Sequence, residues 1–181
     1  MKILAVSGSV RSESTNTQLL RALSYLSPLG VANLDIDIFS SHDKIPVFNP
    51  DLEGVNTPPS VLALCQKISM SDGVIISSPE YIRSIPGGLK NSIDWLVSRN
   101  EIIKKPIALV HASHRGGDVL KSLRRVLSTV SEHFTADVFL QLPLIGMSQA
   151  EVKQEVNSAK YKPKINEFLI QFVKYIESVN K

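Results

Sequence analysis

Three segments of this 181-residue chain combine side chains that suit ligand binding. The first, Gly8–Thr17, surrounds Arg11 with hydroxyl and amide side chains directly before an expected helix: Ser9, Ser12, Ser14, Thr15, Asn16 and Thr17. Backbone N–H groups at a helix start, hydroxyls and a guanidinium together suit a phosphate. An ordinary N-cap needs only one such residue, so the cluster favours a phosphate site.

The glycine spacing of the first segment narrows the class of ligand. It contains neither the Gly-x-Gly-x-x-Gly pattern of dinucleotide sites nor the Gly-Lys-Ser/Thr pattern of nucleoside triphosphatases. A mononucleotide is therefore expected in preference to a dinucleotide pyrophosphate or a hydrolysed triphosphate.

The second and third segments add a planar surface and further donors. Ser77–Asn91 contains two prolines and two adjacent glycines, so its irregular path can expose backbone groups, and Tyr81 can face a planar heterocycle. Ala112–Asp118 contains His114, Arg115 and a glycine pair that permits close backbone approach. A plain strand-to-helix connection and a simple turn are the alternatives for these two segments.

The elements that must position these segments alternate along the chain. Apolar runs predict strands at 3–6, 32–39, 73–76, 106–110 and 138–140, and helical periodicity predicts helices at 16–29, from 58, and at 86–98, 117–130 and 163–179. This alternation predicts an α/β protein with a parallel sheet covered on both faces. In a sheet of order 2-1-3-4-5, the three segments would meet at the switch point between the first and third strands.

Composition restricts the function classes further. The chain is 43% hydrophobic and 20% charged, with net charge +3, and seven basic residues against two acidic ones lie between Arg99 and Arg125. Aromatic residues make up 6% and no recognition motif accompanies the charge, so Arg11 and Arg115 favour a phosphorylated small molecule over nucleic acid.

The apolar run at 3–6 is too short for a signal peptide, no run could span a membrane, and Cys65 is the single cysteine. A cytoplasmic protein without membrane association is expected.

Two motifs carry a resemblance to a known family. They are Gly8-Ser9-x-Arg11-x-x-Ser14-x-Asn16-x-x-Leu19-Leu20 and Pro79-Glu80-Tyr81-x-x-Ser84-x-Pro86-Gly87-x-Leu89-Lys90-Asn91-x-Ile93-Asp94-Trp95. They resemble the NADPH-dependent FMN reductases, flavodoxin-like flavoproteins that include quinone, chromate and azo-compound reductases. The resemblance covers residues 1 to about 130, including a loop at 45–53. It implies a three-layer sandwich that forms one FMN-binding domain over residues 1–181.

The resemblance also implies roles for individual residues. The FMN phosphate would be held by Ser9, Arg11, Ser14, Asn16 and Thr17. The isoalloxazine would be lined by Pro79, Glu80, Tyr81 and Ser84 and by the backbone of Ile82 and Arg83. Ser113 and Gly116 of the third segment would also contact the cofactor. Many members have Asn-Gly where this chain has Ile82-Arg83, which would change ring contacts or substrate access.

The function implied is an NAD(P)H-dependent oxidoreductase. NADPH or NADH would pass hydride to FMN, and a quinone, free flavin or similar acceptor would then be reduced. No catalytic side chain or metal is expected, because the cofactor supplies the chemistry. The alternative is a flavodoxin-type electron carrier without broad turnover, although such carriers tend to be acidic. The acceptor and the choice of nicotinamide stay open.

The predicted helix at 86–98 is expected to contribute to a homodimer or a tetramer, as in the family. Its apolar residues Leu89, Ile93, Leu96 and Val97 would cover the sheet, and Trp95 would lie partly outside this set.

Overall fold

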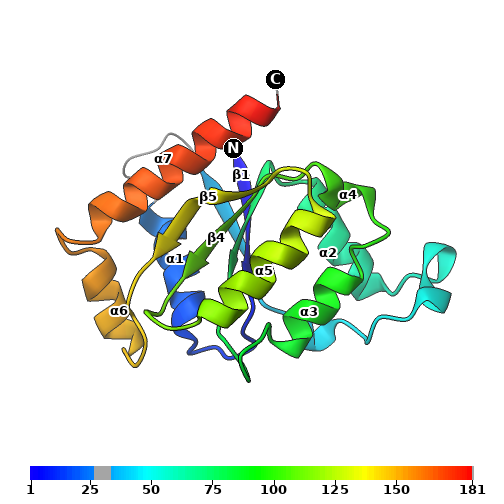
Figure 1. The fold of residues 1–181 in the computed structure, drawn as a ribbon, viewed down its shortest axis with the longest axis horizontal. Coiled ribbons are helices and arrows are strands. Elements are labelled where there is room, and N and C mark those ends of the chain that lie inside the picture. The colour runs from blue at the N-terminus through cyan, green and yellow to red at the C-terminus, as the bar shows by residue number, and fades with distance from the viewer. Residues whose placement is uncertain (27–33, 181) are drawn as a thin grey trace.

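A computed structural model describes residues 1–26 and 34–180. Within these ranges five strands form one parallel sheet in the order β2-β1-β3-β4-β5 (Figure 1). The strands are β1 (Lys2–Ser7), β2 (Asp35–Phe39), β3 (Gly73–Ser77), β4 (Ile107–His111) and β5 (Phe134–Gln141). The predicted sheet and its order are confirmed.

Helices cover both faces of this sheet (Figure 1). One face packs against α1 (Thr15–Leu26), α6 (Gln149–Val156) and α7 (Lys162–Val179), and the other against α2 (Pro59–Ser69), α3 (Gly87–Asp94), α4 (Asn100–Ile103) and α5 (Gly117–Val130). Ile3 and Ala5 of β1 enter the first apolar cluster, whereas Leu4 and Val6 enter the second. This alternation explains why the central strands are apolar throughout. Among the described residues, no helix combines the length and apolar character needed to cross a membrane.

Several predicted boundaries need correction. The predicted helix at 86–98 ends at Asp94, because Leu96 and Val97 bond back to residues three positions earlier and tighten the chain into a turn. The short helices α4 and α6 were not predicted, since one or two turns give little periodicity. The end of the first predicted helix at 27–29 and the start of the second predicted strand at 32–33 lie outside the described residues.

The loop predicted between β2 and α2 forms an arm that contains three short 3₁₀ turns at His42–Lys44, Pro50–Leu52 and Gly54–Asn56. The arm covers Trp95, whose indole N–H donates to the Pro46 carbonyl at 2.8 Å. Trp95 is therefore only 1% exposed, contrary to the expectation that it lies partly outside the packed set. Val97, expected to cover the sheet, is exposed instead.

His42 anchors this arm to the sheet. Its Nε2–H donates to the carbonyl of Ser7 at 2.8 Å, and its Nδ1 lies 2.7 Å from the hydroxyl of Ser92 in α3. Burial lowers the pKa of His42 below its ordinary value of 6.5. The ring links the end of β1 to α3, where the Ser92 hydroxyl also donates to the carbonyl of Gly88 at 3.0 Å.

We expect the free energy of unfolding to decrease as the pH falls below about 6.5, the pKa of a histidine in the unfolded chain. The unfolded chain then binds more protons than the folded one, because the folded pKa of His42 is the lower of the two. Urea denaturation at a series of pH values measures this slope. His42→Gln should flatten it, whereas the exposed control His114→Gln should leave it unchanged. An equal slope in all three proteins would contradict the assignment.

Candidate functional site

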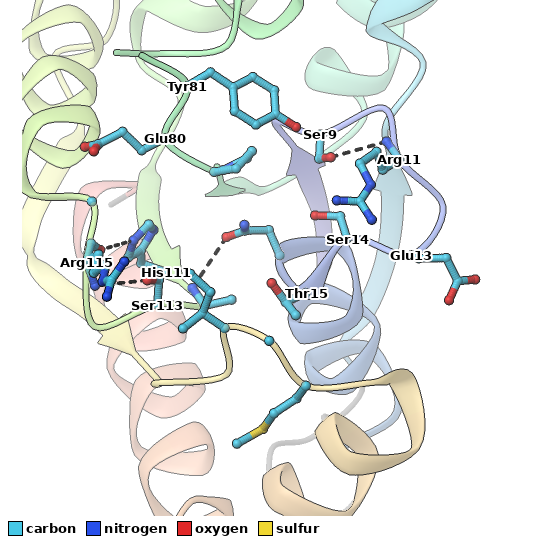
Figure 2. A pocket seen from close by; sticks show the side chains of 17 residues that line it. Ser9, Arg11, Glu13, Ser14, Thr15, Glu80, Tyr81, His111, Ser113 and Arg115 are labelled. Carbon is cyan, nitrogen blue, oxygen red and sulfur yellow. Dashed lines mark hydrogen bonds between the residues drawn. The ribbon is translucent and has the colours of Figure 1, made fainter. Parts of the chain in front are cut away.

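A cavity of about 490 Å³ lies at the carboxyl end of the sheet (Figure 2). Its volume falls within the range typical of small-molecule sites. The three predicted segments all contribute to its walls, together with a loop that follows β5. The lining residues are Ser9, Arg11, Glu13, Ser14, Thr15, Asn16, Pro79, Glu80, Tyr81, His111, Ala112, Ser113, Arg115, Gly116, Ile145, Gly146 and Met147.

Most of the predicted site residues are brought together here. Nine of the thirteen line the cavity: Ser9, Arg11, Ser14, Asn16, Pro79, Glu80, Tyr81, Ser113 and Gly116. Thr17 does not, because it is buried behind the first loop, with its hydroxyl 2.7 Å from that of Ser7. Ile82, Arg83 and Ser84 also lie outside the lining, in the turn that follows Tyr81.

Asn16 holds the loops of the cavity together. It lies in the first turn of α1, and its side-chain oxygen accepts from the hydroxyl of Ser77 at 2.8 Å. The same oxygen lies 3.4 Å from the backbone nitrogen of Ala112, directly after β4. The amide thus connects the start of α1 with the ends of two strands.

Gly8 lets the first loop approach the second. Its backbone N–H donates to the carbonyl of Ser77 at 2.7 Å. A Cβ at this position would lie 2.6 Å from the Ser78 hydroxyl and 2.8 Å from Leu89, too close for any side chain. A larger residue at position 8 would therefore require Ser78 and Leu89 to shift.

Two arginines and two glutamates line the cavity, and they differ in their contacts. Figure 2 shows Arg11 and Arg115 on opposite sides of it, and neither forms a salt bridge within the described part of the chain. The two acidic lining residues are already engaged. Glu80 accepts from the backbone N–H of Val119 at 2.9 Å, and Glu13 accepts from Gln149 at 2.9 Å. Two guanidinium groups therefore remain available to a negatively charged ligand.

The first loop supplies hydroxyl donors next to Arg11. Ser9 and Ser14 line the cavity, and the Ser9 oxygen accepts from the backbone N–H of Arg11 at 3.2 Å, which leaves its hydroxyl hydrogen free to donate. The first turn of α1 contains no acidic residue, so the positive end of the helix dipole is not offset there. Tyr81 forms another wall with a half-exposed ring. The cavity can hold a ligand that joins a phosphate to a planar ring.

Two parts of the cavity were missed or undervalued by sequence reasoning. The loop of Ile145, Gly146 and Met147 follows β5, and its position after a parallel strand was the available signal. His111, at the end of β4, was not among the predicted site residues. It lines the cavity, and its Nε2–H donates to the carbonyl of Arg115 at 2.6 Å, which shapes the third loop. Arg115 lies at the cavity as expected, whereas Arg124 of the same basic cluster stacks over Phe139 at 5.0 Å.

A doubly wound parallel sheet with a polar cavity at its switch point defines a flavodoxin-like fold. The sequence matches the NADPH-dependent FMN reductase family over residues 1–141. Because the match covers more than half of the chain, the protein belongs to this family.

Individual relatives agree with this assignment. A quinone reductase of Escherichia coli K12 is 34% identical over 119 residues, which are 64% of this chain and 61% of that protein. The chain therefore matches about three fifths of that relative's length. A quinone reductase of Pseudomonas putida KT2440 is 32% identical over 178 residues, or 94% of this chain and 90% of the relative. The solved structure of FerB, a flavoenzyme NAD(P)H:(acceptor) oxidoreductase of Paracoccus denitrificans, has a TM-score of 0.75 at 26% identity and covers 98% and 97% of the two chains.

The third loop provides a test of the cavity's construction. Gly116 has a φ of 95°, and a Cβ there would lie 2.5 Å from Nε2 of His111. Gly116→Ala should lower the free energy of unfolding by about 1–3 kcal/mol. Gly117→Ala is the matched control, because no atom lies within 4 Å of the place that its methyl group would occupy and its φ is ordinary. Chemical denaturation should separate the two variants, and equal stabilities would refute this account of the loop.

Proposed function

We propose that this protein is an NAD(P)H-dependent FMN reductase that reduces quinones or similar acceptors. The balanced reaction is NAD(P)H + H⁺ + quinone → NAD(P)⁺ + hydroquinone. The observation that carries the proposal is one cavity in which the hydroxyl- and arginine-containing loop before α1 faces the ring of Tyr81. The names and activities of the relatives support the same chemistry.

The residues present fit FMN. We propose that Arg11, Ser9 and Ser14 hold its phosphate, since they supply a guanidinium and two hydroxyls at the start of α1. Pro79, Tyr81 and Gly116 would line the ring and its approach. When bound, FMN accepts two electrons from a reduced nicotinamide and delivers them to an acceptor.

The chain's own contribution is binding and orientation. Asn16 belongs to the first turn of α1 and contacts Ser77 at the end of β3 and Ala112 after β4. It thereby holds the first loop, which carries the phosphate donors, in place relative to the second and third loops. Arg115, on the wall opposite Arg11, is placed to attract an anionic co-substrate. We further propose that residues 1–181 form one FMN-binding domain. The buried, single cysteine supports a cytoplasmic location.

Purified protein supplied with FMN should quench flavin fluorescence on binding and oxidise NADPH or NADH when a quinone is added. Arg11→Ala should weaken FMN binding by about tenfold, which corresponds to one charge-assisted hydrogen bond. The exposed Arg21→Ala on α1 serves as the control, because Arg21 does not line the cavity. Flavin binding without turnover would favour the electron carrier instead, and absence of flavin binding would overturn the proposal.

We also propose a homodimer built on the arm and the turn at 95–99 that follows α3. Val47, Val55 and Val97 are exposed there. A small cavity lined by Thr57, Trp95 and other residues of both segments shows that the arm and this turn are neighbours. Three exposed valines on adjacent segments suit burial against a second copy.

The double variant Val55→Lys/Val97→Lys should be monomeric by light scattering coupled to size exclusion, because an apolar interface does not tolerate unpaired charges. Met70→Lys changes a residue at the end of α2 that is 60% exposed, close to the 66% of Val97, and should leave the oligomeric state as it is. A dimer that persists in the double variant would locate the interface elsewhere.

A further inference from the structure

The turn that follows Tyr81 has an unfavourable sequence for its backbone conformation. The backbone groups of Tyr81 and Ser84 exchange two hydrogen bonds, at 3.0 and 3.1 Å, around the central residues Ile82 and Arg83. These have φ angles of 49° and 59°, the only positive values among the described residues other than glycine. A two-residue turn with both φ angles positive is of type I′, which prefers Asn-Gly because other residues are strained there.

Nothing in the described part of the fold compensates this strain at Ile82. A positive φ is an outlier for a β-branched residue, and the side chain of Ile82 is 99% exposed. It therefore gains no burial within the chain and leaves an apolar group in water. Strained residues of this kind concentrate at ligand-binding positions, where the conformation serves a contact outside the chain's own core.

The turn is nevertheless held firmly in place beside the cavity. Glu80, which precedes it, accepts from the backbone N–H of Val119 at 2.9 Å. Arg83 donates from Nε to the carboxylate of Asp118 at 2.6 Å. Both contacts reach the first turn of α5, and the loop before α5 forms another wall of the cavity. Tyr81 lines the cavity (Figure 2), and Ile82 follows it directly in the chain, outside the lining.

We propose that Ile82 determines specificity for the electron acceptor by contacting its apolar part at the rim of the cavity. This inference rests on the proposed reductase function. The acceptor class it selects is quinones with alkyl substituents or a fused aromatic ring, because only these bury the Ile82 side chain on binding. Small hydrophilic acceptors gain nothing from the contact. Arg83 and Glu80 act as positioning residues, through their contacts with α5.

The test compares two acceptors in the full-length, FMN-loaded protein. Ile82→Thr keeps the β-branch and its strain but replaces part of the apolar surface with a hydroxyl. We expect the KM for 2-methyl-1,4-naphthoquinone to rise about fivefold, with kcat unchanged, as for loss of a small apolar contact. The KM for ferricyanide should stay within about twofold of that of the unaltered protein. Ile103→Thr is the matched control, since Ile103 is partly exposed in α4, at the other end of the sheet.

A second variant separates the contact from the strain. Ile82→Asn relieves the turn and removes the apolar group, so its melting temperature should rise while its KM for the naphthoquinone rises as in Ile82→Thr. FMN affinity, measured by fluorescence quenching, should be unchanged in both variants.

Four results would overturn the inference. They are an unchanged naphthoquinone KM in an active Ile82→Thr variant, an equal rise for both acceptors, a weakened FMN affinity, or a change in oligomeric state, which would assign Ile82 to an interface between copies. Failure of the unaltered protein to reduce any acceptor would instead overturn the proposed function, and this inference with it.

Discussion

The side chain of Asn16 joins parts of the chain that the sheet alone would leave separate. In a doubly wound sheet, α1 and α3 leave the sheet on opposite faces, so the loops after β1 and β3 diverge and open a crevice. The Asn16 oxygen bridges this region by accepting from Ser77 and by facing the backbone N–H of Ala112. Because a buried amide must be hydrogen-bonded, the position of each loop constrains the others.

Helix α5 also holds the loops at the carboxyl end of the sheet in place. Glu80 caps the first turn of this helix and Arg83 pairs with Asp118, so the second loop is tied to the third. His111 then shapes the third loop through the carbonyl of Arg115, and only glycine at 116 leaves room for its ring. These contacts keep the backbone of the cavity in position while Arg11 and Arg115 remain free for a ligand.

The arm between β2 and α2 connects this site to the surface proposed for dimerisation. Its base is fixed by His42 against the Ser7 carbonyl, the last residue of β1, and by Trp95 and Asn91 against Pro46. Phe48 packs edge-to-face on Trp95 at 5.1 Å. The arm thus starts beside the first loop of the cavity and presents its exposed valines further out. One segment contributes to both the core under α3 and the candidate interface.

The parallel sheet and three of the four loops at the cavity could be predicted from the amino-acid sequence, and the strand order is a common doubly wound one. Apolar runs such as Ile3–Val6 and glycine- and hydroxyl-rich segments after them depend on local chain chemistry, which sequence records directly. Three features follow only from the three-dimensional fold: Thr17 turns inward to Ser7, Trp95 is covered, and Ile145–Met147 completes the cavity. The fold also decides the strained path at Ile82 and Arg83. Each of these depends on contacts between residues distant in the chain, which no local pattern encodes.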